Sequence, residues 1–440
     1  MEETYGERRM EEAYALERLT VARVTRHIIP FLFALFVANY LDRVNVSFAA
    51  LQMNRDLAFS GTAYGVGAGL FFLGYCLFQV PSNFVLQRVG APRWIGSLTI
   101  AWGVVAVCMM LVRSATSFYV LRFLLGAVEA GFFPGMIHYL TRWFPARERA
   151  KAAARFMTAI PVAQIVGGPI SGALLGLQGV AGLAGWQWLF LIEGLPSIAL
   201  GFGVFAWLTD RPEDARWLPG EERDWLLGEL RREAPPAGAP RGAGVLLRTP
   251  ALWWLSVQWI LIVLVGYGQL LWLPQIIKGA SGIGNVALGL LSMMPPLVAA
   301  VVMVWVASRS DRTGNRRGYV AGAYLVSALG FLLTAAGLKS PLLATAALSI
   351  VAIGIASSFG PFWGFATAAL PADVSATGTA LISSIGSLGG LVGPIAVGLV
   401  KDATGSFEGA LVSFAALAAI GALVARLTPA ASPAGSAAAR

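Results

Sequence analysis

The 440 residues are 57% hydrophobic and only 12% charged, about half the charged fraction of a soluble globular protein. Too few charges are present to coat a water-exposed surface, so the composition excludes an ordinary soluble domain. The formal net charge of +9 comes from basic residues scattered in short segments between apolar runs. That distribution argues against a nucleic-acid-binding surface. It is typical of a membrane protein, in which basic residues mark the segments that stay on one side of the bilayer.

Twelve apolar runs are long enough to cross a bilayer, which takes about 20 residues in a helix. Six precede and six follow a polar segment rich in Pro and Gly. We therefore predict an all-α membrane protein in which twelve transmembrane helices form two pseudo-symmetric six-helix bundles. The runs lie near residues 28–52, 62–87, 92–112, 117–141, 150–177, 187–208, 249–277, 284–308, 317–338, 341–369, 374–400 and 407–427.

The polar segments divide the chain into five parts. We expect a cytoplasmic N-terminal segment, a first bundle, a cytoplasmic linker, a second bundle and a cytoplasmic tail at residues 1–27, 28–208, 209–248, 249–427 and 428–440. The first segment is too charged for a signal peptide, so the first span must insert as its own signal. The linker is expected to contain a short amphipathic helix near 221–232, and the low-complexity tail to be disordered.

Basic residues are unevenly placed between the runs. Clusters follow the second, fourth and eighth runs, at Arg88, Arg93, Arg142, Arg147, Arg149, Lys151, Arg155, Arg309, Arg312, Arg316 and Arg317. The intervening segments hold single basic residues, at Arg55, Arg113, Lys278, Lys339 and Lys401. By the positive-inside rule the clusters and both chain ends lie in the cytoplasm, and we expect a bacterial inner membrane.

The second half reads as a copy of the first. In each half, Pro-Ala precedes a helix that carries Gly-Pro a little over twenty residues later, over 145–169 and 371–394. The basic segments LQRVGAPRW and SRSDRTGNRRG follow the second and eighth runs. A duplication of this kind places a substrate site near the mid-membrane between the halves, and rocking of the halves then gives alternating access.

A duplicated six-plus-six bundle with a basic loop after its second helix resembles the major facilitator superfamily. The loop signature of that superfamily, G-x-x-x-D-R-x-G-R-[KR], is matched in part. Gln87 precedes Arg88 where Asp is usual in the first loop, whereas Asp311 and Arg312 fit in the second. The resemblance implies gating roles for Arg88, Asp311 and Arg312, with a weaker latch in the first half.

Further segments resemble the anion:cation symporter family, within its branch of tartrate, 4-hydroxyphenylacetate, phthalate and nicotinate permeases. They are YLDRVN (40–45), RFLLGAVEAGFFPG (122–135), RWFPARERA (142–150), FMTAIP (156–161), WQWLFLIEGLP (186–196) and LTDRPEDARWL (208–218). The resemblance implies proton-coupled uptake of a small organic carboxylate, with the proton gradient as the energy source and no cofactor.

Charged residues interrupt two stretches that are otherwise typical of bilayer-spanning helix, at Asp42 and Arg43 in the first span and at Arg122 and Glu129 in the fourth. An ionised side chain at the bilayer centre costs at least ~3 kcal/mol, so such groups usually face a protein interior. Arg122 and Glu129, seven residues apart, share a helix face at a spacing of about 10 Å along the axis. A packing ion pair is the structural alternative for these two residues. Asp42 and Arg43 are about 100° apart around their helix and cannot both point at one site unless the helix is distorted.

An organic carboxylate needs a permanent cation, and the bidentate fork of arginine matches its geometry, so Arg43 is the candidate for direct contact. Proton coupling needs a carboxyl group whose burial disfavours its charged form, a role that suits Asp42 and Glu129. We hypothesise that protonation of Glu129 releases Arg122, and that protonation of Asp42 frees Arg43 for the anion.

Further candidate substrate contacts are polar or aromatic side chains within the spans, together with the second arginine: Tyr75, Arg122, Gln164, Tyr267, Trp363 and Ser383. Related permeases usually carry INSIGNLGG in the eleventh helix, and Ser383 and Ser387 stand here in place of Asn. A hydroxyl makes fewer hydrogen bonds than an amide, so the pocket is expected to be roomier or less polar.

No arginine lies in the seventh helix, so a substrate with two negative charges would have to be held by Arg43, Arg122 and neutral donors alone. A monocarboxylate is therefore favoured over a dicarboxylate. Glu193, near the outer end of the sixth helix, is assigned a structural hydrogen-bonding role.

Besides a proton-coupled symporter, an exchanger or exporter, a membrane sensor and a membrane enzyme are alternative functions. An exchanger or exporter of organic anions would use the same fold, and a membrane sensor without transport is a third reading. An enzyme would need a nucleophile with a base or a metal cluster, and two histidines with two cysteines in apolar runs provide neither. We therefore expect no metal site and no nucleic-acid partner. The expected partners are the lipid bilayer, protons and a small organic anion, bound by a monomer.

Overall fold

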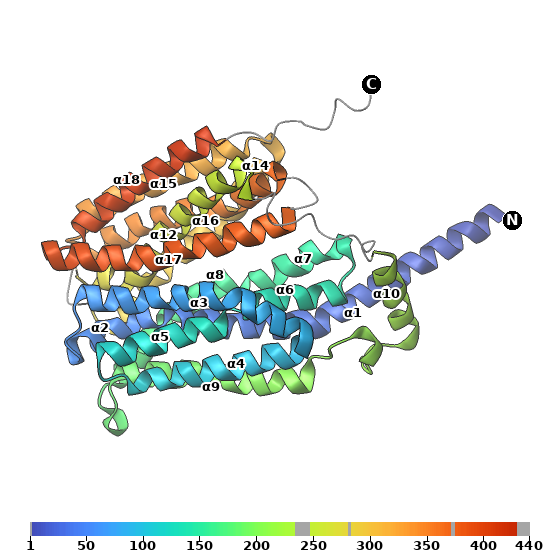
Figure 1. Ribbon diagram of the computed structural model, residues 1–440, viewed down its shortest axis with the longest axis horizontal. Coiled ribbons are helices and arrows are strands. Elements are labelled where there is room, and N and C mark those ends of the chain that lie inside the picture. The colour runs from blue at the N-terminus through green and yellow to red at the C-terminus, as the bar shows by residue number, and fades with distance from the viewer. Residues whose placement is uncertain (1, 234–246, 280–282, 371–374, 429–440) are drawn as a thin grey trace.

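The computed structural model describes residues 2–233, 247–279, 283–370 and 375–428 (Figure 1). Within these ranges, twelve helical spans are long and apolar enough to cross a membrane. The predicted all-α architecture of twelve spans is confirmed. The predicted disorder of the tail falls on residues outside the described ranges, apart from Thr428.

The first half of the chain forms six spans. Its helices are α1 (Glu2–Val44), α2 (Val46–Asp56), α3 (Gly61–Val89), α4 (Ala91–Cys108), α5 (Ala115–Glu129), α6 (Phe132–Trp143), α7 (Ala146–Met157), α8 (Ala159–Leu174) and α9 (Gly185–Trp207). Short 3₁₀ turns come after three of these helices: η1 (Met109–Leu111) after α4, η2 (Leu175–Leu177) and η3 (Val180–Gly182) after α8, and η4 (Pro212–Asp214) after α9. In the linker, α10 (Gly220–Arg232) is the amphipathic helix that the sequence predicts, and its Glu222 binds Arg23 of α1 at 3.0 Å.

The second half forms six more spans. Its helices are α12 (Pro250–Gly279), α13 (Asn285–Ser292), α14 (Met294–Thr313), α15 (Arg316–Gly337), α16 (Pro341–Ala369), α17 (Ser375–Thr404) and α18 (Glu408–Leu427). Figure 1 shows the two halves as separate bundles lying side by side, with the linker at one end.

Four spans are interrupted, which the apolar runs did not reveal. The first is divided between α1 and α2 at Asn45, the fourth between α5 and α6 at 130–131, the fifth between α7 and α8 at Thr158, and the eighth between α13 and α14 at Met293. Discontinuous helices are frequent at the binding sites of transporters, because a break frees peptide groups and changes the direction of side chains. Two of these breaks adjoin the charged residues singled out in the sequence.

The halves contact each other through equivalent helices. α3 packs along α17, and α8 packs on α13, so the second and fifth spans of one half meet the fifth and second of the other. Glycines make this approach possible: a Cβ on Gly65 would meet the carbonyl of Pro394, and a Cβ on Gly168 would meet the carbonyl of Gly289. Both Gly-Pro pairs of the sequence repeat therefore lie at the contact between the halves.

The two ends of the molecule differ. We call the end with α10 and the turns at 89–91, 143–146 and 313–316 the terminal end, and the end with the turns at 56–61 and 404–408 the far end. At the far end the carboxylate of Asp402 accepts hydrogen bonds from the backbone N–H groups of Gly61 and Thr62, at 2.8 and 2.7 Å. The halves are closed there and diverge toward the terminal end (Figure 1).

Candidate functional site

Arg43 and Glu129 form an ion pair between the first and fourth spans. The Nη2 and Nε atoms of Arg43 lie 2.9 and 3.2 Å from Oε2 of Glu129, and Nη2 also donates to Oδ1 of Asn39 at 3.3 Å. Glu129 is completely buried, whereas the Arg43 side chain remains 13% exposed. Both donors of Arg43 share one carboxylate oxygen, and Oε1 of Glu129 has no hydrogen-bond partner. The pair therefore uses only part of the binding capacity of each group.

The backbone breaks position this pair. α1 ends at Val44, directly after Arg43, and α5 ends at Glu129 itself. Asn45, at the first break, is buried, and neither end of its amide has a hydrogen-bond partner. Unpaired polar groups therefore collect where the first and fourth spans are interrupted.

Aromatic rings cover the guanidinium group of Arg43. Its Cζ lies 5.2 Å from the ring centre of Phe71 and 5.3 Å from that of Tyr75. Phe71 also lies 5.0 Å from Cζ of Arg122, so one ring contacts both arginines. A cation over an aromatic face gains ~0.5–2 kcal/mol, depending on its hydration. Tyr75, a predicted substrate contact, thus lies beside the cation that is the candidate anion ligand.

Arg122 does not pair with Glu129 in a salt bridge, and that prediction is wrong. Helix α5 does place the two on one face, but the carboxylate of Glu129 is turned toward Arg43. Arg122 is 1% exposed and, within the described part of the chain, donates only to the carbonyl of Ala68, at 3.5 Å, while its Nε and Nη1 atoms have no partner there. In this conformation Arg122 is enclosed between α3 and α5 and is not accessible to a substrate.

Asp42 points away from Arg43, as the 100° spacing predicts. Its Oδ2 accepts a hydrogen bond from Ser197 of α9 at 2.5 Å, and its Oδ1 has no partner. Asp42 is 1% exposed and has no ion pair with a described residue. The expectation that Asp42 restrains Arg43 is therefore not met, because the two side chains face different helices.

Glu193 lies one helical turn before Ser197 on α9 and is 5% exposed. Its Oε1 accepts a hydrogen bond from Ser171 of α8 at 2.8 Å, which agrees with the predicted hydrogen-bonding role. Its Oε2 has no partner. Asp42 and Glu193 also interact electrostatically, so two buried carboxyl groups, each accepting a hydrogen bond from a serine hydroxyl, lie on one side of α1.

The second half reaches this site through Tyr267 of α12. Tyr267 packs edge-on against Phe72 of α3 at 4.4 Å and lies within electrostatic range of Arg43 and Tyr40. Gln164 of α8 donates to the hydroxyl of Tyr40 at 2.6 Å. The predicted contacts Tyr75, Gln164 and Tyr267 are therefore gathered around Arg43 and Tyr40. Tyr40, the first residue of the YLDRVN segment, was not predicted to belong to the site.

Trp363 and Ser383 lie elsewhere in the second half. Trp363 of α16 packs against Trp259 of α12 at 4.7 Å, within a cluster that also contains Phe359 and Phe362. Ser383 is half-buried on α17, and its neighbour Ser384 donates a hydrogen bond across the halves to Gln79 at 2.9 Å. The structure does not bring Trp363 or Ser383 into contact with Arg43.

The predicted gating residues are at the terminal end. Arg88 and Arg312 occupy the last turns of α3 and α14 and are exposed. Asp311 lies 3.8 Å from Arg316, whose Nη1 donates to the carbonyl of Gly364. The second-half loop is thus fixed to α16 by Arg316, which the sequence analysis singled out only for its charge.

Asp210, in the LTDRPEDARWL segment, supplies the missing carboxylate of the first-half loop. It accepts hydrogen bonds from the N–H of Ala91 at 3.3 Å and from Arg142 at 3.0 Å. Gly90, at φ 93°, allows the chain to turn from α3 into α4 at this point, and a Cβ there would touch Asp210. An acid from the segment after α9 therefore stabilises the turn where Gln87 stands in place of the usual Asp.

Within the described ranges, no group of three His, Cys, Asp or Glu residues is placed to hold a metal ion. Cys76 and Cys108 are free and half-buried. The chemistry of the site thus rests on the arginines, carboxyls, tyrosines and amides described above.

The arrangement can be compared with known proteins. The family model for the Major Facilitator Superfamily matches residues 32–394. The chain belongs to that superfamily. It is 46% identical over 425 residues to an Agrobacterium vitis protein named "Putative tartrate transporter", an alignment that covers 95% of this chain and 93% of the relative. It is also 39% identical over 397 residues to a "Quinolone resistance transporter" of Acinetobacter baumannii, an alignment that covers 90% of this chain and 91% of that relative.

Solved structures agree on the fold. A bacterial homologue of the human lysosomal transporter Spinster superposes with a TM-score of 0.77 at 18% sequence identity, covering 92% of this chain and 96% of that one. This superfamily member is therefore a multi-pass membrane transporter and not an enzyme, and the predicted resemblance to the organic-anion branch is confirmed by the relatives.

Proposed function

We propose that this transporter takes up a small organic carboxylate together with protons by alternating access, and that Arg43 binds the substrate. The observation that carries the proposal is the half-satisfied ion pair of Arg43 with Glu129. Two guanidinium donors converge on one oxygen, and the arginine side chain keeps some exposure. A substrate carboxylate that accepts one bond on each oxygen would match the fork better than Glu129 does.

The charges of the first half favour proton binding. Three buried carboxyl groups, Asp42, Glu129 and Glu193, accompany the buried Arg122 and the partly buried Arg43. Of the three, only Glu129 has an arginine of the described ranges within salt-bridge distance. A buried carboxylate without a counter-charge is costly, and a bound proton removes that cost. A carboxylate substrate adds a further negative charge, so proton uptake on Glu129 compensates for substrate binding.

The order of events differs from the one first hypothesised from the sequence. Protonation of Glu129 weakens its pairing with Arg43, and Arg43 then becomes free for the incoming anion. Asp42 acts separately, through Ser197 and α9, on the packing of the first half. The loaded, neutralised site permits the halves to reorient, since less charge must be moved through a low-dielectric interface.

The basic clusters of the sequence lie at the terminal end, so the positive-inside rule supports a cytoplasmic location for that end and for both chain termini. Because the halves are closed at the far end, the conformation corresponds to one that opens toward the cytoplasm (Figure 1). Tartrate is the first probe, since the A. vitis relative is named for it. A second candidate function, export or exchange, is motivated by the quinolone-resistance relative.

Transport of labelled L-tartrate into proteoliposomes tests the proposal. An inward proton gradient of one pH unit provides about 1.4 kcal/mol per proton, enough for roughly tenfold accumulation by each coupled proton. We expect accumulation by the wild-type protein and none by the Asp42→Asn and Glu129→Gln variants. Accumulation by both variants at the wild-type level would refute the proton assignment. Uptake that needs internal substrate and ignores the pH gradient would favour exchange.

A further inference from the structure

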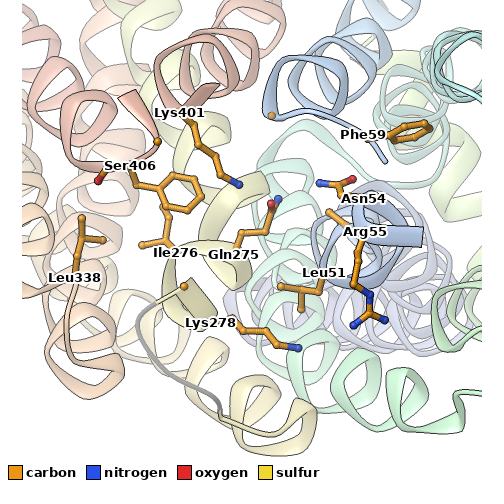
Figure 2. A pocket seen from close by; sticks show the side chains of 15 residues that line it. Leu51, Asn54, Arg55, Phe59, Gln275, Ile276, Lys278, Leu338, Lys401 and Ser406 are labelled. Atoms are coloured by element: carbon orange, nitrogen blue, oxygen red, sulfur yellow. The ribbon is translucent and has the colours of Figure 1, made fainter. Parts of the chain in front are cut away.

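A pocket of about 490 Å³ opens at the far end, between the two halves. Leu51, Asn54 and Arg55 line it from α2, and Gln275, Lys278 and Lys401 line it from α12 and α17 (Figure 2). These are residues of opposite halves, so the pocket in this form depends on closure of the far end. It is separated from Arg43 by most of α2, because Arg43 lies in the last turn of α1, before the break at Asn45, whereas Arg55 lies in the last turn of α2.

The lining is basic. Arg55, Lys278 and Lys401 all contribute, and none of the described lining residues is acidic. In the sequence these three are isolated basic residues in separate segments, and the fold brings them together. Lys278 and Arg55 are close enough to interact electrostatically, as like charges. A concentration of positive charge in a concave site attracts small anions.

The nearby carboxylates neutralise this charge only in part. Asp56 pairs with Arg55 at 3.4 Å in an exposed contact, which is worth little in water. Asp402 follows Lys401, but its two oxygens accept from the N–H groups of Gly61 and Thr62.

Lys401 itself lies over two aromatic rings, 5.1 Å from the centre of Trp272 and 4.7 Å from that of Phe407. Lys278 donates to Asn285 at 2.9 Å. Both ammonium groups keep donors available, since each has three.

A buried donor adds an independent indication of a ligand. Gln275 is 8% exposed, and its Nε2 atom has no hydrogen-bond partner among the residues that the structure describes. Figure 2 shows the amide of Gln275 and the amine of Lys401 directed into the same space, with Asn54 facing them. An unpaired buried N–H group is costly, and an anionic oxygen in the pocket would satisfy it.

We propose that this pocket is a second anion site, which binds a small di- or tricarboxylate between Arg55 of the first half and Lys278 and Lys401 of the second. The ligand class is that of the proposed substrate, so this inference rests on the proposed function. Because the cations lie on opposite walls, they favour a ligand with more than one carboxylate over a ligand with a single negative charge. A ligand that contacts both halves stabilises the conformation closed at the far end.

Lysine labelling of the purified full-length protein tests the site without relying on transport. Pyridoxal 5′-phosphate is an anionic probe that forms an imine with lysine, which borohydride fixes and mass spectrometry quantifies. We expect L-tartrate to reduce labelling of Lys278 and Lys401 at least threefold. Lys339, at the same end but outside the pocket lining, serves as the internal control and should be labelled equally with and without tartrate.

Variants separate this site from the transport site. Protection of Lys278 and Lys401 from labelling by L-tartrate should persist in the Arg43→Gln variant even where transport is lost. Glu129→Gln replaces that variant if Arg43→Gln is unstable. Protection should weaken in Arg55→Gln but not in Arg113→Gln, an exposed far-end control. Absence of protection in the wild-type protein, or its loss in both transport-site variants, would overturn the proposal. Equal protection by sulfate at the same concentration would show a non-selective anion site and would overturn the carboxylate assignment.

Discussion

Arg43 has two possible partners of the same chemistry, a protein carboxylate and a substrate carboxylate. In the structure the guanidinium is held by Glu129 and is covered by Phe71 and Tyr75. Removing one member of a buried pair leaves an uncompensated charge, which costs about 3–5 kcal/mol, whereas a substrate carboxylate that replaces Glu129 leaves the charge of the site unchanged when Glu129 takes up a proton. In the proposed function, competition between two carboxylates links substrate binding and proton uptake at a single arginine.

Glu193 provides a test at the residue scale that separates a coupling carboxyl from a structural one. Glu193 accepts a hydrogen bond from the hydroxyl of Ser171, and the amide oxygen of glutamine can accept the same bond. We expect Glu193→Gln to retain proton-driven tartrate accumulation within about twofold of the wild-type level. Glu129→Gln is the matched variant and should abolish it. Loss of accumulation in Glu193→Gln, with normal expression and folding, would assign Glu193 to the coupling machinery.

At the scale of the helices, close packing depends on glycine. A Cβ on Gly126 of α5 would meet the backbone carbonyl of Phe71 on α3, and backbone cannot move aside as a flexible side chain can. This contact fixes the helix that carries Phe71 against the one that ends at Glu129. The geometry of the ion pair therefore depends on how closely α3 and α5 approach.

Replacing Gly126 by alanine should destabilise the protein by ~1–3 kcal/mol, the usual cost of overpacking. The purified protein should then unfold several degrees lower in a thermal-shift assay. Gly322→Ala on α15 is the control, because a Cβ at that position would meet open space, and alanine gains up to about 1 kcal/mol over glycine in a helix. Equal thermal midpoints for the two variants would contradict the packing argument.

Sequence periodicity and length were sufficient to find the spans and the linker helix. Each span is an apolar run of about bilayer length, and that property depends only on local composition. The interruptions at Asn45 and 130–131 were not predicted, because a broken helix keeps the same apolar composition. The pairing of Glu129 with Arg43 was missed for a related reason: residue spacing fixes the face of one helix, whereas pairing depends on the neighbouring helix.

At the scale of the whole molecule, the contacts between the halves divide the structure into a closed far end and a diverging terminal end (Figure 1). The side-chain carboxylate of Asp402 on α17 accepts two hydrogen bonds from backbone N–H groups at the start of α3. This connection must break if the far end is to open. Alternating access therefore requires that the first turn of α3 separates from the last turn of α17.

A reversible cross-link tests that requirement. After replacement of Cys76 and Cys108, the double variant Thr62→Cys with Asp402→Cys should react with a short bifunctional thiosulfonate. We expect the cross-linked protein to transport at under about a tenth of its uncross-linked rate and to recover with reductant, because the far end cannot open. The two single cysteine variants are the controls. Unchanged transport by the fully cross-linked protein would contradict opening at this contact.

Proton movement during substrate entry is the most direct measurement of coupling at Arg43 and Glu129. Proteoliposomes that enclose a pH-sensitive dye are given external L-tartrate without any imposed gradient, while uptake of labelled tartrate is followed in parallel. We predict that the lumen acidifies as wild-type protein admits tartrate and that Glu129→Gln gives no acidification. Entry of labelled tartrate through the wild-type protein with no change in lumenal pH would contradict proton-coupled uptake.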